Sequence, residues 1–155
     1  MKKTTLLLTI IFLFSIPLLA DKITKNVDDQ PKTGTINVVI TGIRNNDGVV
    51  LVGLYNQADT FLKRNNYYKG LSLDISNKKA TGTFTNIPYG TYAIAFFHDE
   101  NKSGKMDYSF IGFPLEGFGF SNNFKPGLLS QPKFDDAKFN LETNCTTIEM
   151  TTNYL

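Results

Sequence analysis

The sequence predicts an all-β protein, an antiparallel β-sandwich of immunoglobulin-like or transthyretin-like type with about seven strands and one long loop. Seven Tyr and thirteen Phe, together with many Thr and Val, favour strands over helices. Apolar and polar residues alternate in several short segments that are separated by turn residues. The chain has 155 residues, which is enough for one domain, and its 41% hydrophobic and 19% charged content is typical of a globular protein.

The first twenty residues have the pattern of a signal peptide. Lys2 and Lys3 precede an apolar run that extends from Leu6 to Leu19, and Ala20 is a small residue suited to cleavage before Asp21. The run is shorter than the roughly 20 apolar residues that span a bilayer, so an uncleaved anchor is the less favoured alternative. We therefore expect an exported protein, periplasmic or extracellular, whose mature chain has no integral membrane segment.

This interpretation divides the chain into a signal peptide (1–20), a flexible lead-in (21–33) and a β-sandwich domain (34–155). The whole chain has 16 basic and 14 acidic residues, but residues 1–20 carry two of the lysines and no acid, so the mature chain has no net charge. A neutral chain gives no support for nucleic-acid binding or for binding to an anionic membrane. Cys145 is the only cysteine, so no intramolecular disulfide can form, and we interpret it as a small apolar residue at a strand edge.

Residue patterning predicts strands at 35–43, 49–55, 71–75, 80–87, 91–98, 137–141 and 148–154, of which 49–55 is apolar on both faces and is expected to be central. Asn45 to Gly48 has the composition of a hairpin turn between the first two strands, because Asn, Asp and Gly tolerate positive φ. A second turn at 77–79 pairs the strand 71–75 with the strand 80–87, and Phe118 to Phe120 is a candidate extra strand. The predicted core contains Ile36, Val38, Ile40, Leu51, Ile94, Phe96, Phe139 and Ile148.

The segment from about Asp99 to Lys133 is too long for an ordinary connection, since structureless loops beyond about 15 residues are uncommon unless they are functional or disordered. Its aromatic residues can pack it onto the sandwich. Its glycines permit tight bends of the backbone, and its prolines restrict the backbone's freedom. Four of its oxygen-bearing residues stand where a calcium loop places ligands 1, 3, 5 and 9, namely Asp99, Asn101, Ser103 and Asp107.

Other positions of this loop match the calcium pattern only in part. Gly104 is at position 6, where the turn needs glycine, and Lys105 is at position 7, where only the backbone carbonyl binds the ion. Position 12 is Phe110 where a Glu is required, and the preceding segment is a strand, so this is no EF-hand. The sequence leaves two interpretations open. One is a weak calcium site completed by waters or by another side chain, namely His98, Glu116, Asp135 or Asp136, and the other is an ordinary turn built by hydrogen bonds to its own backbone.

The same region carries a family resemblance. Phe97-His-Asp-Glu-Asn101, then Gly112-Phe-Pro-Leu-Glu-Gly-Phe-Gly-Phe-Ser-Asn122 and Phe134-Asp-Asp-Ala-Lys-Phe139 resemble a bacterial family of small exported proteins catalogued as a domain of unknown function, number 2141. The likeness extends from about Gly34 to the C-terminus. It implies an exported single domain of Greek-key β-sandwich type, and it supplies no activity, substrate or catalytic residue.

Two function classes follow. The first is a non-enzymatic binding or structural module, with an envelope protein or glycan as partner and calcium as its one candidate cofactor. The second is a small envelope hydrolase that uses His98, the only histidine, with nearby carboxylates such as Glu100 and Glu116. No catalytic residue is assigned, because a histidine at the end of a sandwich strand more often anchors a loop through its two ring nitrogens. The sequence contains no G-x-S-x-G motif and no histidine pair with zinc spacing.

Overall fold

The computed structural model describes residues 31–127 and 130–155, so the predicted signal peptide and most of the predicted lead-in lie outside the described residues. Within this part of the chain there are nine strands, one 3-10 helix and one short α-helix. Their bounds are β1 Thr33–Thr41, β2 Val49–Tyr55, β3 Lys69–Leu73, β4 Ile75–Ser76, β5 Lys79–Pro88, β6 Gly90–Asp99, β7 Phe118–Phe120, η1 Ser121–Asn123, α1 Phe134–Ala137, β8 Lys138–Leu141 and β9 Cys145–Thr151. The all-β prediction is confirmed, with nine strands instead of seven.

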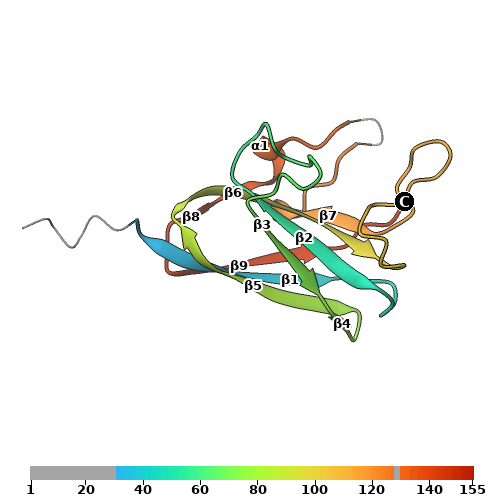
Figure 1. Ribbon diagram of the computed structural model, residues 1–155, viewed down its shortest axis with the longest axis horizontal. Coiled ribbons are helices and arrows are strands. Elements are labelled where there is room, and N and C mark those ends of the chain that lie inside the picture. The colour runs from blue at the N-terminus through green and yellow to red at the C-terminus, as the bar shows by residue number, and fades with distance from the viewer. Residues whose placement is uncertain (1–30, 128–129) are drawn as a thin grey trace, which may run out of the picture. The chain divides into compact units, whose positions relative to one another are not determined.

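The strands form two sheets that face each other (Figure 1). One sheet has the order β4-β5-β1-β9, and the other has the order β3-β2-β6-β7, with β8 also paired to β6. β6 is the central strand of the second sheet, because β2 lies along one side while β8 and β7 lie end to end along the other. All pairings are antiparallel except that of β1 with β9, so the predicted antiparallel sandwich is confirmed, with one parallel pairing at this edge.

The predicted hairpin at Asn45–Gly48 is wrong. β1 pairs with β5 and β9, whereas β2 pairs with β3 and β6, so the connection 42–48 carries the chain from one sheet to the other. Gly48 does adopt the positive φ expected of it, at +71°. Turn residues permit a sharp reversal, but they do not decide whether the next strand pairs beside the last one or opposite it.

The hairpin expected around 77–79 forms, but it is shorter than predicted. Asn77 and Lys78 have φ of +52° and +58° and connect β4 to β5, as a two-residue turn with positive φ requires. The segment 71–75 does not pair with β5 as a whole. It divides at Asp74 into β3, which pairs with β2, and β4, which pairs with β5. The predicted extra strand at 118–120 is present as β7.

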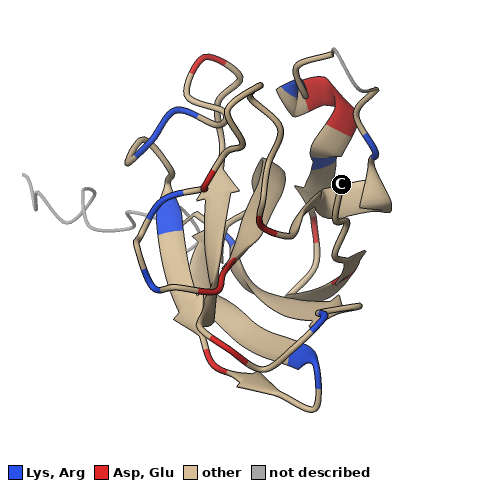
Figure 2. Cartoon of the chain, turned by 90° about the vertical axis from the view of Figure 1, so that its right-hand side faces the viewer, with Lys and Arg blue, Asp and Glu red and all other residues tan. Residues whose placement is uncertain are grey.

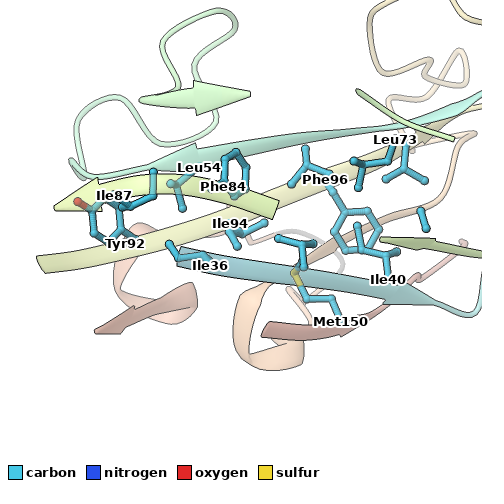
Figure 3. Close-up of a cluster of buried hydrophobic side chains, with 14 of the residues drawn as sticks. Ile36, Ile40, Leu54, Leu73, Phe84, Ile87, Tyr92, Ile94, Phe96 and Met150 are labelled. Carbon is cyan, nitrogen blue, oxygen red and sulfur yellow. The ribbon is translucent and has the colours of Figure 1, made fainter. Parts of the chain in front are cut away.

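The main core lies between the sheets and is drawn in Figure 3. Five of the eight predicted core residues are buried there: Ile36, Val38, Ile40, Ile94 and Phe96. Phe139 and Ile148 are half-buried and pack against this core, whereas Leu51 is half-buried and does not, so the prediction is wrong for Leu51. Leu51 fails because β2 alternates, with Val50, Val52 and Leu54 facing the core and Leu51 on the other face of the sheet.

A second, smaller cluster covers the outer face of β6 and contains Tyr55, Phe61, Ala93, Phe120 and Ala137. The loop after β2, together with α1, lies over this face (Figure 1). β6 is therefore buried on both faces along its centre, which makes its C-terminal end a rigid support for the loop that follows it. No helix within residues 31–127 and 130–155 is long and apolar enough to cross a membrane.

Candidate functional site

The candidate site is built where β6 ends and the chain enters the long loop at residues 100–117. Figure 2 views the sandwich from the side on which this loop lies. The pairing of β6 with β2 places His98 opposite Val50 and Asp99 opposite Val49. Gly48 lies so close that a Cβ built on it would be 1.9 Å from the carbonyl oxygen of Asp99. The 42–48 connection is thus packed directly against the start of the loop.

His98 is the penultimate residue of β6, next to the start of this loop, and its exposed fraction is 0%. Its Nε2 is 2.7 Å from the carbonyl oxygen of Asp47, and because a carbonyl only accepts, Nε2 carries the hydrogen and donates it. Its Nδ1 is 2.9 Å from Oη of Tyr154, which itself accepts the backbone N–H of Arg44 at 3.0 Å and so has its own hydrogen to donate to Nδ1. Both ring nitrogens therefore form hydrogen bonds, which join β6 to the 42–48 connection and to the C-terminal segment.

Glu100 joins the same connection to the loop. One of its carboxylate oxygens pairs with the Arg44 guanidinium at 2.5 Å, and the other accepts from Asn45 Nδ2 at 2.9 Å. Burial acts to raise the pKa of Glu100, but the hydrogen bonds from Asn45 and Arg44 and the charge of Arg44 outweigh it and lower the pKa. The Arg44 guanidinium also lies 4.7 Å from the ring centroid of Tyr154, a cation–π distance.

The first turn of the loop closes on the carboxylate of Asp99, which is almost fully buried. Its Oδ1 accepts the backbone N–H of Ser103 at 2.9 Å, and its Oδ2 accepts that of Gly104 at 2.8 Å. Gly104 has φ of +73°, so it supplies the left-handed backbone expected at position 6 of the calcium pattern.

The remaining predicted ligands take part in the same hydrogen-bond network. Asn101 Oδ1 accepts from the Ser103 N–H at 3.0 Å, while its Nδ2 donates to Asp107 Oδ2 at 2.6 Å. Ser103 Oγ donates to the carbonyl of Lys105 at 2.9 Å. The five predicted metal-ligating residues therefore belong to one turn, as the sequence indicated.

Glu116 lies at the C-terminal end of the loop and links it by hydrogen bonds to the loop's first half. This buried side chain accepts the backbone N–H of Glu100 at 3.0 Å and that of Asp107 at 3.1 Å. Burial raises the pKa of Glu116, the charges of Asp107 and Asp99 raise it further, and the two N–H groups act in the opposite direction. Three carboxylates are thus gathered at the base of the loop.

The charge of this cluster is not neutralised by basic side chains. Among the described residues, no Lys or Arg forms an ion pair with Asp99, Asp107 or Glu116. The same part of the chain contains no group of three or more His, Cys, Asp or Glu side chains arranged to hold a metal ion. The loop brings the predicted ligands together, and its own N–H groups occupy much of their hydrogen-bonding capacity.

Sequence reasoning named His98 and Glu116 among the additional ligands. Glu116 lies in the cluster, whereas His98 has no free ring nitrogen to offer a metal ion or a substrate. The hydrolase interpretation required His98 at the floor of an open pocket, and its complete burial does not meet that requirement. No sequence pattern indicated a role for Arg44 or Tyr154, which come from distant parts of the chain.

Residues 38–149 match the protein family described as "Uncharacterized protein conserved in bacteria (DUF2141)". The chain belongs to this family. The match spans both sheets and the whole loop of this DUF2141 domain, and it confirms the resemblance inferred from the loop motifs. Neither the curated proteins nor the solved structures include a match to the chain.

Proposed function

We propose that this DUF2141 domain is an exported, non-enzymatic binding or structural module whose 100–117 loop is ordered by weakly bound calcium. The observation that carries the proposal is the un-neutralised carboxylate cluster of Asp99, Asp107 and Glu116. Two of these carboxylates, Asp99 and Glu116, are at least nine-tenths buried. Burying charge is costly unless an opposite charge or several hydrogen bonds compensate it. A divalent cation would supply the missing opposite charge.

The chemistry of the cluster suits a hard cation. Carboxylate, amide, hydroxyl and carbonyl oxygens are the ligands that calcium prefers, and here they come from Asp99, Asn101, Ser103, Asp107 and the carbonyl of Lys105. Each carboxylate oxygen has two lone pairs, so accepting one N–H leaves capacity for a metal. Glu116 is the side chain that compensates for the absent acid at position 12.

Such a site would be weak, because the residue at position 12 is Phe110 and some of the ligand capacity is used within the loop. We expect a dissociation constant of about 10⁻⁴–10⁻³ M, the range of extracellular modules. At about 1 mM calcium this affinity stabilises the folded state by roughly 0.4–1.4 kcal/mol. For a domain of this size the unfolding midpoint then rises by roughly 2–8 °C.

The test is thermal unfolding of the mature protein with calcium and with a chelator. Calcium should raise the midpoint of the parent protein, and Asp107→Asn should remove that rise. Asp59→Asn is the matched control, because Asp59 is an exposed carboxylate in the loop between β2 and β3. A midpoint that does not move up to about 10 mM calcium, well above the expected affinity range, would leave the loop as a self-supporting turn.

The proposal of export has a separate test. The lysines, the apolar run and Ala20 support cleavage before Asp21. N-terminal sequencing of the protein from a cell-envelope fraction should find a chain that begins near Asp21. Recovery of the chain with Met1 intact in the membrane pellet would contradict export of a processed protein.

A further inference from the structure

The distal part of the loop forms a small hairpin, residues 107–115, which we call the tip hairpin. Leu115 N donates to the carbonyl of Asp107 at 2.9 Å, and Ser109 N donates to the carbonyl of Phe113 at 2.7 Å. Its base is held by Glu116, which binds the N–H of Asp107. These bonds hold the hairpin in one conformation, and it stands apart from both sheets at the right of Figure 1.

The hairpin ends in a four-residue turn from Ser109 to Gly112. Gly112 N donates to the carbonyl of Ser109 at 2.9 Å, the Ser109 hydroxyl oxygen accepts the N–H of Phe113 at 3.0 Å, and Gly112 has φ of +87°. The two corner positions of this turn are Phe110 and Ile111, with exposed fractions of 105% and 74%. Turn corners usually carry Gly, Pro, Asn, Asp or Ser. Here they present two large apolar side chains to solvent.

The polarity of the loop changes in order away from this turn. Tyr108 and Leu115 are both more than half exposed; Tyr108 lies just before the turn, and Leu115 lies at the base of the hairpin, opposite Asp107. The exposed charges earlier in the loop are Lys102 and Lys105, whereas Asp107 is half-buried and bonded to the loop. An apolar end, then a tyrosine, then lysines is the order in which side chains meet a membrane surface, where aromatic rings lie at headgroup level and lysines extend to the phosphates.

We propose that the tip hairpin inserts Phe110 and Ile111 into the surface of an anionic lipid membrane. The mature chain has no net charge, but the exposed Lys102 and Lys105 supply local positive charge that complements such a surface, and each basic residue near it contributes to attraction. Because internal bonds already order the hairpin, insertion does not require it to fold first. The acidic side chains at the base of the hairpin, Asp107 and Glu116, are directed into the loop by their hydrogen bonds.

A second copy of the chain is a weaker occupant of this surface. A fully exposed aromatic side chain offers about 150–250 Å², so the four exposed apolar side chains of the tip hairpin offer roughly 500 Å² together. A stable protein interface buries about 800 Å² on each partner. Membrane insertion has no such threshold, because any apolar side chain that enters the bilayer leaves water.

The experiment measures sedimentation of the mature protein with vesicles of phosphatidylcholine alone and with vesicles that contain equal parts of phosphatidylglycerol. The parent protein should bind the anionic vesicles more strongly. The double variant Phe110→Ser/Ile111→Ser should bind at least about tenfold more weakly, as expected when one or two large apolar side chains are removed from a buried position. Leu62→Ser is the matched control, because Leu62 is an exposed leucine in a different loop, and it should bind like the parent.

A fluorescent variant separates insertion from adsorption. The chain has no Trp, so Phe110→Trp introduces a single reporter at the tip, and Leu62→Trp places one at the control position. Vesicles should shift the emission of Trp at 110 to shorter wavelength and leave that of Trp at 62 unchanged. Equal binding of the parent and the double variant, or no shift at 110, would overturn the proposal, as would self-association of the parent without vesicle binding.

This inference uses the proposed export only to bring the protein to an envelope membrane, and it does not depend on calcium. Vesicle binding is therefore measured both with calcium and with a chelator. If calcium fails to raise the unfolding midpoint but the tip variants still lose vesicle binding, the calcium proposal fails and the insertion stands. If the midpoint rises but the tip variants bind like the parent, the insertion fails alone.

Discussion

Replacement of the buried histidine tests whether it anchors the loop. In His98→Phe the ring keeps roughly its volume, but the carbonyl of Asp47 loses its donor and the hydroxyl of Tyr154 loses its acceptor. A buried polar group left without a partner costs about 1–3 kcal/mol. Asp47 is exposed and Tyr154 is half-buried, so water can replace part of what is lost, and we expect the variant to lose about 1–3 kcal/mol of unfolding free energy. That is a measurable part of the roughly 5–15 kcal/mol by which a domain is stable.

The assay is urea unfolding followed by circular dichroism, which yields a free energy of unfolding for a two-state domain. If His98→Phe does not fold, Tyr154→Phe is the milder variant, because it leaves the bond from His98 to Asp47 in place. The double variant should lose less than the sum of the two single losses, since residues in one hydrogen-bond network are coupled by about 0.5–3 kcal/mol. A loss below about 1 kcal/mol in His98→Phe, less than one unsatisfied group costs, would refute the anchor role.

Three further predictions concern stability. Ile94→Ala should cost roughly 2–5 kcal/mol because its side chain is fully buried, and Leu51→Ala on the outer face of the sheet should cost clearly less, as urea unfolding can compare. Gly48→Ala should destabilise the fold strongly, because its φ is positive and its Cβ would overlap a backbone carbonyl, and a variant as stable as the parent would contradict this packing. Since Arg44 helps hold the pKa of Glu100 below its ordinary value of 4.5, the stability that Glu100 adds is present above pH 4.5 and is lost as the pH falls through the lowered pKa. The difference between the parent and Glu100→Gln should therefore shrink in acid unfolding curves, and a difference independent of pH would contradict the ion pair.

Part of the candidate site was predictable because it is local in the sequence. Asp99, Asn101, Ser103 and Asp107 lie within nine residues, so the chain itself keeps them together once Gly104 permits the turn. Hydrogen bonds between Asx side chains and nearby backbone N–H groups need only this short spacing. The position of Glu116 was a conjecture from proximity in the chain, and the structure places it in the cluster.

The other part of the site depends on residues that are distant in the sequence. His98 forms hydrogen bonds with Tyr154 and with the backbone of Asp47, which are 56 and 51 positions away in the sequence. No hydrophobic periodicity predicts contacts between residues so far apart. The hydrophobic pattern also did not predict exposure at the tip, since Phe and Ile, the residue types at positions 110 and 111, are usually buried. Only the hairpin geometry shows that they point into solvent.

The sequence by itself determined the class of the fold, the strands of its core and the residues of the calcium-like turn. Alternation along Ile36, Val38 and Ile40 specifies which face of β1 is buried, because successive side chains of a strand point to opposite faces. The tertiary structure decided which strands are neighbours, and it separated β1 and β2 into different sheets despite the turn residues between them. The physical reason is that backbone hydrogen bonds between strands do not depend on side-chain identity, so pairing is selected by the burial of the whole chain and not by any one segment.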